Sequence, residues 1–260
     1  MLLSYLHRLP DIAILAVIVL SITGLAMLAP FFGRHVIRLP DSAGRDEAAF
    51  EGFKAVMSMT GVVLAFSLVQ VNGNLQSIEG RVAKEGATLL TIDRALQRIG
   101  LPEADALRPA LNDFAKKQTQ LEWPLLAKEQ RSPQVDAAYS VLSRAARSIN
   151  PTDKHQETVF SELLKSLDDL SDNREAILAD ASIRLPEFFW ITSIGLLLVS
   201  LSLGVLMKST VTRIVSVGAT SAAVGLLLGF VVIVDEPFAG DTSVSPKPIL
   251  TAVALNQRRS

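Results

Sequence analysis

Residues 12–32 read IAILAVIVLSITGLAMLAPFF, and residues 214–234 read IVSVGATSAAVGLLLGFVVIV; neither stretch contains a charged residue. Two further uncharged runs cover residues 55–71 and 188–207. A helix needs about 20 apolar residues to cross the hydrocarbon core of a bilayer, and about 17 is the lower limit. The four runs therefore predict four transmembrane helices, of which the second lies at the short end of the range.

The spacing of these runs predicts how the chain is organised. Short connections, residues 33–54 and 208–213, join the runs into two pairs, whereas about 115 residues rich in charge separate the pairs. We expect an all-α membrane protein with four transmembrane helices and a soluble helical bundle inserted between spans two and three. The expected domains are a transmembrane hairpin (1–74), a soluble four-helix lobe (75–185) and a second hairpin with a C-terminal tail (186–260).

Apolar residues in the expected lobe recur at intervals of three and four, which is typical of the buried face of a helix. The pattern predicts helices over residues 75–99, 107–125, 133–149 and 160–181. Glycine and proline separate them, because these residues interrupt helices. Short breaks between four helices favour an antiparallel bundle.

Two charged residues occupy positions on the expected buried faces of these helices, where the pattern predicts apolar stripes. Glu85 falls on the buried face of the first lobe helix, and Arg174 falls on that of the last. Each lies 14 residues from the end of its neighbouring span, which places both at a similar height if the helices are continuous. We expect a buried ion pair between them; the alternative is that each side chain extends separately into solvent.

The second span is the polar one. Thr60, Ser67 and Asn74 recur every seven residues, and Gln70 lies on the same side of the helix. These side chains could form a water-facing wall, or the hydroxyls could bond to the backbone while the amides mark the membrane interface. The fourth span instead carries a stripe of small residues that predicts close packing within the subunit: Gly218, Ala222, Gly225 and Gly229.

Several classes of protein are disfavoured. The spans contain no charged residue, which argues against a proton relay, and a net charge of −1 without a basic run argues against nucleic-acid binding. The chain has no cysteine, and its three histidines lack ligand spacing. We expect no enzyme activity, cofactor or metal site; the acidic residues after span four, Asp235, Glu236 and Asp241, are interpreted as a charged stop at the membrane surface.

Charge gives little guidance on orientation. An even number of spans puts both termini and the lobe on one face of the membrane. That face and the opposite one each carry six Lys or Arg near the spans: Arg8, Arg81, Lys84, Arg174, Arg184 and Lys247 against Arg34, Arg38, Arg45, Lys54, Lys208 and Arg213. Because Arg8 directly precedes span one and no cleavage site follows, we expect a multi-pass protein of the cell inner membrane with a cytoplasmic lobe.

A set of short motifs resembles the bestrophin-like family of four-span membrane proteins, long catalogued as a domain of unknown function. After span four come residues 235–240, DEPFAG, and then Val244-Ser245-Pro246. Other landmarks in the same order are Glu85-Gly86, where the family has Glu-Ala, then Glu122-Trp123-Pro124, Arg174, Leu185-Pro186 and Trp190. The family-motif positions carried over are Trp123, Pro124, Asp235, Pro237, Phe238 and Gly240.

The resemblance implies a distant relation to bestrophins, pentameric anion channels whose pore follows the second span and a cytosolic helical lobe. It therefore implies a homo-oligomer in the lipid bilayer that conducts small ions, with anions expected by analogy alone. On this interpretation the pore-lining candidates are Thr60, Phe66, Ser67, Gln70 and Asn74, with Phe66 or a ring of Val and Leu as a constriction. The alternative function is a non-conducting scaffold or sensor whose lobe binds a partner or ligand.

Overall fold

The computed structural model describes residues 10–37 and 43–259 and contains helices without a single strand in those ranges. Four helices are long and apolar enough to cross a membrane: α2 (Asp11–His35), α3 (Ala43–Ile99), α9 (Glu187–Val205) and α10 (Val211–Val234). Three of the predicted spans lie wholly within these helices, and α9 contains the third as far as Val205, two residues before its predicted end. Three residues lie outside the described ranges: Arg8 and Arg38, which were counted in the comparison of charges, and His7.

The chain divides into two compact units. Residues 1–73 and 184–242 form one, here called the span unit, and residues 74–183 and 243–260 form the other, here called the lobe unit. Helix α3 runs without a break from the first into the second, because neither glycine nor proline kinks its 57 residues. The unit boundary after Thr242 assigns the last residues of the chain to the lobe unit.

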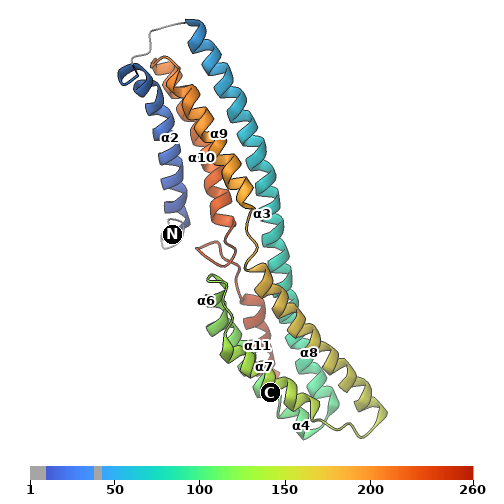
Figure 1. Cartoon of the computed structure of the whole chain (residues 1–260). Coiled ribbons are helices and arrows are strands. Elements are labelled where there is room, and N and C mark those ends of the chain that lie inside the picture. The colour runs from blue at the N-terminus through green and yellow to red at the C-terminus, as the bar shows by residue number, and fades with distance from the viewer. Residues whose placement is uncertain (1–9, 38–42, 260) are drawn as a thin grey trace. The chain divides into compact units, whose positions relative to one another are not determined.

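In the span unit, α10 is the inner helix (Figure 1). In its most apolar window 61% of residues are buried, against 17% for α2, 28% for α3 and 22% for α9. Its small residues permit this: a Cβ added at Gly225 would lie 3.1 Å from Cα of Val19, and one at Gly218 would lie 3.0 Å from Sδ of Met27. The predicted small-residue face thus packs against α2 of the same chain.

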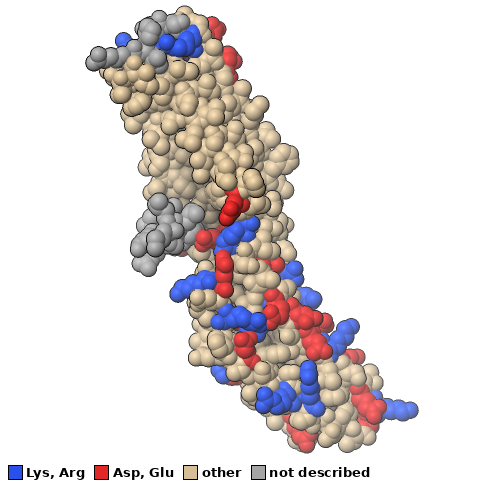
Figure 2. Space-filling model, in the orientation of Figure 1, with Lys and Arg blue, Asp and Glu red and all other residues tan. Residues whose placement is uncertain are grey.

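The core of the span unit joins α3 to the other spans. Phe53, Met57 and Leu64 of α3 are almost fully buried and cluster with Val217 and Val224 of α10. At one end, Asp46 of α3 accepts a hydrogen bond from the Lys208 backbone N–H at 2.8 Å. Around this unit the surface seen in Figure 2 has a broad band without Lys, Arg, Asp or Glu, as a lipid-facing surface requires.

The lobe unit contains the second half of α3 and six further α-helices within the described residues. These are α4 (Pro102–Asp105), α5 (Arg108–Lys117), α6 (Trp123–Leu126), α7 (Pro133–Arg147), α8 (Lys154–Asp180) and α11 (Lys247–Arg259). A π-helix, η1 (Gln118–Glu122), joins α5 to α6. The predicted breaks at Gly100 and at Asn150-Pro151 are present. Helix α11, which the expected bundle of four did not include, packs against α5.

Candidate functional site

The second span, the first half of α3, has two chemically different faces. Thr60 and Ser67 lie on the inner face and are 1% and 8% exposed. Their hydroxyls donate to backbone carbonyls one turn earlier, Thr60 to Val56 at 2.8 Å and Ser67 to Val63 at 3.0 Å. The structure therefore places these two pore-lining candidates in the core of their own subunit, on another face of the helix than Phe66.

The outer face of the same span is apolar and repeats every three or four residues. Its large side chains are among the most exposed in the span unit: Met59 (62%), Val62 (53%), Phe66 (75%) and Val69 (72%). Gln70 is also exposed, whereas Asn74 is half-buried and belongs to the lobe unit. Of the five pore-lining candidates, the structure therefore brings only Phe66 and Gln70 to the outer surface of the span unit.

In the lobe unit, Glu85 of α3 is fully buried, as the stripe predicted. Its carboxylate accepts hydrogen bonds from two amides, Asn173 Nδ2 at 2.6 Å and Gln118 Nε2 at 2.9 Å. Burial disfavours the charged carboxylate more than these hydrogen bonds and the nearby Arg174 favour it, so the pKa of Glu85 is raised above its ordinary value. Glu85 is thus a buried acid that titrates at higher pH than a solvated glutamate.

Arg174 of α8 is also buried, but its carboxylate partners are Glu122 and Asp136. Its Nε and Nη2 donate to Glu122 Oε2 and Oε1 at 2.7 and 2.5 Å, and Nη2 lies 2.8 Å from Asp136 Oδ1. Burial works against the guanidinium, but these carboxylates outweigh it and raise the pKa of Arg174. The direct Glu85–Arg174 pair that we expected is not formed; Glu122 occupies that place as a bidentate partner.

The π-helix explains why helical periodicity does not predict Glu122 as the partner of Arg174. A strict three-and-four pattern through residues 107–125 puts Leu121 and Leu125 on the buried face. A π-turn adds one residue to the turn, so the positions that face inward shift by one. Leu121 is consequently 38% exposed, while Glu122 and Leu126 are each 2% exposed. The wide turn over Gln118–Glu122 thus brings two polar residues into the core.

The family-motif positions make structural contacts within each unit. Asp235 Oδ1 accepts a hydrogen bond from the Leu185 backbone N–H at 2.9 Å. Gly240 has a φ of +75°, and a Cβ there would lie 2.3 Å from Asp11 Oδ1, so this position requires glycine. Phe238 is buried, and Pro237 precedes it in the turn after α10. In the lobe unit, Trp123 Nε1 donates to the Val244 carbonyl at 3.0 Å, and Pro124 is the second residue of α6.

Acidic and histidine side chains do not gather elsewhere into a recognisable site. Among residues 10–37 and 43–259, no group of three His, Cys, Asp or Glu is placed to hold a metal ion. Asp235 accepts a hydrogen bond from Leu185, and the interpretation of the acidic residues after α10 as a charged stop at the membrane surface stays a prediction. Buried polar side chains of the lobe unit form the network around Glu85 and Arg174 and, separately, an ion pair between Arg108 Nε and the fully buried Asp93 at 2.8 Å.

Four helices that are long and apolar enough to cross a bilayer, in a chain whose described residues form helices and no strand, indicate an all-α membrane protein. The chain belongs to the bestrophin-like family, since the family model of the Bestrophin-like domain matches residues 24–249. Membership supports a membrane protein of the channel type. No curated protein matches the chain.

Solved structures share the fold at low sequence identity. Two crystal structures of a membrane protein, each a point variant, align with TM-scores of 0.63 and 0.59 at 12% and 13% identity; they cover 95% of this chain and 96% and 95% of theirs. A bacterial bestrophin homologue from Klebsiella pneumoniae, also a point variant, aligns with a TM-score of 0.57 at 12% identity, covering 95% of this chain and 98% of its own. At such identities the likeness establishes the fold alone.

Proposed function

We propose that several copies of this chain assemble around an axis in the cell inner membrane and conduct small ions, with anions preferred. The outer face of the second span would line the pathway. Spans one and three of each copy would face lipid or neighbouring copies, and span four would pack inside its own subunit. No catalytic activity is part of this proposal.

The observation that carries the proposal is the separation of the two faces of α3. Its inner face is committed to the subunit core, so only its outer face is available to an axis shared by several copies. Met59, Val62, Phe66 and Val69 on that face would each form a ring in such an assembly. A narrow ring of large apolar side chains excludes water when it is closed, which is how hydrophobic constrictions gate channels. Phe66, the most exposed of the four, is the candidate constriction.

The distribution of charge along α3 supports a preference for anions. At 3.6 residues per turn, Lys84 lies five turns after Phe66 and thus on the same side of the helix. On this helical wheel Arg81, Lys84, Arg94 and Arg98 all lie within about 80° of Phe66, whereas Glu79, Glu85 and Asp93 lie about 100° or more away. A pathway along this side would meet cations and no carboxylate from α3, and positive rings favour anions.

Thr60 and Ser67 take a structural role in this proposal. Their hydroxyls are satisfied by the backbone of their own helix, as the second interpretation of this stripe expected. Gln70 remains a candidate for the pathway because it is exposed and lies about 40° from Phe66 on the wheel. Replacing Gln70 by Leu should alter ion flux, whereas replacing Ser67 by Ala should leave it unchanged.

The proposal is tested by reconstitution. Native mass spectrometry of the protein in nanodiscs measures the number of copies, and chloride flux from liposomes measures conduction. We expect an oligomer with chloride flux well above that of empty liposomes, and smaller potassium flux. A monomer that transports neither chloride nor potassium would overturn the proposal and favour the alternative of a scaffold or sensor.

Orientation is a separate part of the proposal. We propose that the lobe and both termini are cytoplasmic. Reporter fusions after Ser260 and within residues 44–46 should give opposite signals, with a cytoplasmic signal at Ser260. A periplasmic signal at Ser260 would reverse the orientation without affecting the assignment of the pathway.

A further inference from the structure

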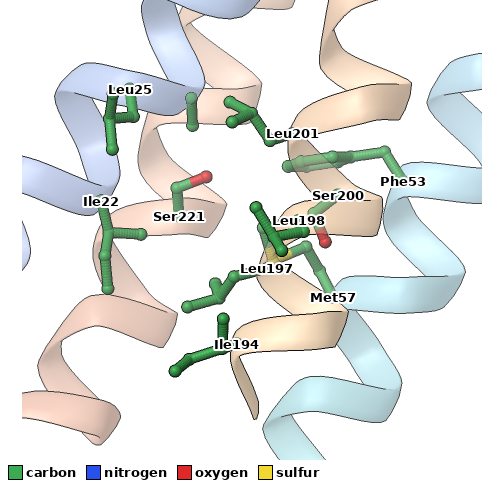
Figure 3. A pocket seen from close by; sticks show the side chains of 11 residues that line it. Ile22, Leu25, Phe53, Met57, Ile194, Leu197, Leu198, Ser200, Leu201 and Ser221 are labelled. Carbon is green, nitrogen blue, oxygen red and sulfur yellow. The ribbon is translucent and has the colours of Figure 1, made fainter. Parts of the chain in front are cut away.

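The span unit contains an apolar pocket on the inner side of α3 (Figure 3). Its volume is about 150 Å³, and all four spans contribute side chains to its wall. Phe53 and Met57 come from α3 and Ser221 comes from α10. The pocket therefore lies among the four spans of one subunit and is distinct from the outer face of α3.

One polar group inside this pocket has no partner. Ser221 is fully buried, and its hydroxyl oxygen makes no hydrogen bond within the described chain. The neighbouring Ser200 differs, because its hydroxyl donates to the Leu196 carbonyl at 2.8 Å. In Figure 3 the Ser221 hydroxyl points away from α10 into the space among the labelled side chains. A buried hydroxyl without a partner is costly, so the site favours a molecule that supplies one.

The pocket opens towards the apolar surface of the span unit. Leu25 of α2 is 58% exposed, and Ile194 and Leu198 of α9 are 55% and 58% exposed, whereas Phe53 at the inner end is 1% exposed. Entry is thus between α2 and α9, through a surface that faces lipid in a membrane. A molecule that enters here must partition into the bilayer first, which excludes ions and strongly polar compounds.

Size and chemistry select the kind of occupant. A protein cavity of about 150 Å³ lined by apolar side chains accommodates a molecule the size of benzene and does not hold water, which needs two to four polar partners. An acyl chain would fill the space but leave Ser221 unpaired. We propose that this pocket binds a small neutral lipophilic alcohol, an alkanol or a phenol, whose hydroxyl pairs with Ser221. The proposal does not depend on whether the protein conducts ions.

Photolabelling in phosphatidylcholine nanodiscs tests this site. The probes are a six-carbon alcohol bearing a diazirine and the matched six-carbon alkane diazirine without a hydroxyl. We expect saturable labelling by the alcohol on pocket residues such as Met57. Ser221→Ala should weaken labelling by the alcohol about three- to tenfold, the effect of one neutral hydrogen bond, while labelling by the alkane is unchanged. Ser202→Ala, an exposed serine of α9, is the matched control and should change neither.

A second variant closes the entrance without touching the core. Leu198→Trp should remove labelling of Met57 by both probes, and because position 198 is exposed this variant should fold even if Ser221→Ala did not. Equal labelling by alcohol and alkane in every variant would mean that the hydroxyl contributes nothing to binding and would overturn the proposal. Labelling spread evenly over outward residues such as Ile12 and Val215 would also overturn it.

Discussion

Arg174 donates from two nitrogens to both carboxylate oxygens of Glu122, with Nε 2.7 Å from Oε2, and both side chains are buried. This bidentate pair links α8 to the π-helix that joins α5 to α6. Glu122 Oε1 also accepts a hydrogen bond from the Ser132 backbone N–H. The pair therefore connects three parts of the lobe unit that are distant in the sequence.

Removing one partner of this pair should destabilise the lobe unit strongly. Arg174→Gln leaves the buried Glu122 carboxylate without its cation and should cost about 3 to 5 kcal/mol. Glu122→Gln should cost less, because Asp136 remains 2.8 Å from Arg174 Nη2. The double variant should cost less than the sum, because neither charge is then left unpaired. Thermal or denaturant unfolding measures these effects. The control is Glu175→Gln, which removes the exposed partner of Arg131 and should cost less than about 1 kcal/mol.

Glu85 should make stability depend on pH in a defined direction. Since burial raises its pKa in the folded state, the folded protein holds this proton more tightly than the unfolded chain. The resulting stabilisation is fully present below the ordinary pKa near 4.5 and is lost as pH rises through the raised pKa. The unfolding midpoint of the wild type relative to Glu85→Gln should therefore be highest near pH 4.5 and fall towards neutral pH.

The control for this pH series is Glu162→Gln, an exposed glutamate of α8. Its difference from the wild type should be nearly flat over the same range. A wild-type advantage over Glu85→Gln that stays constant or grows with pH would show that the pKa of Glu85 is not raised.

Close packing of α10 on α2 should make one glycine irreplaceable. Gly225→Val places a side chain 3.1 Å from the Cα of Val19, a backbone atom that cannot move aside alone. We expect a clear loss of folded protein, of the size seen for overpacked cores, about 1 to 3 kcal/mol or more. Gly195→Val on α9 is the matched control, since a Cβ there meets nothing within 4 Å. Equal tolerance of both variants, measured by size-exclusion profile and thermal midpoint, would refute this packing.

Hydrophobic runs and helical periodicity were enough to predict the spans and the course of the lobe helices. They also predicted that Glu85 and Arg174 are buried, because both fall on stripes of apolar residues. The partner of Arg174 could not be predicted, since a π-turn at residues 118–122 shifts the register and no sequence pattern marks it. Helix α11 was not predicted, although its buried residues Ile249, Ala252, Val253 and Asn256 follow a spacing of three and four, because this stripe is short and ends on a polar residue.

Polarity alone also does not predict which face of the second span is buried and which is exposed. In water a polar stripe turns outward, but in a membrane helix Thr and Ser can bond to their own backbone and pack in the core. Thr60 and Ser67 do so. The exposed stripe is apolar and includes Phe66, so composition alone could not distinguish it from a lipid-facing surface.

Lys84 should influence which ions pass. If the side of α3 that contains Phe66 lines the pathway, Lys84→Glu replaces a ring of positive charge by a negative one and should move the reversal potential in a chloride gradient towards that of the cation. Lys165→Glu makes the same change on the exposed surface of α8 and is the matched control. Planar-bilayer recordings under asymmetric potassium chloride measure both. An identical small shift for the two variants would argue against a role for Lys84 in selectivity.

The central claim is that the outer face of the second span lines an ion pathway, and single-cysteine accessibility tests it most directly. The chain has no cysteine, so each introduced thiol is the sole target. A charged methanethiosulfonate reagent should change the current through Phe66→Cys and Val62→Cys channels, but not through Leu64→Cys, buried on the inner face, or Leu198→Cys, exposed on α9. Modification of current at Leu64 or Leu198 but not at Phe66, or no current from any well-folded protein, would contradict the claim.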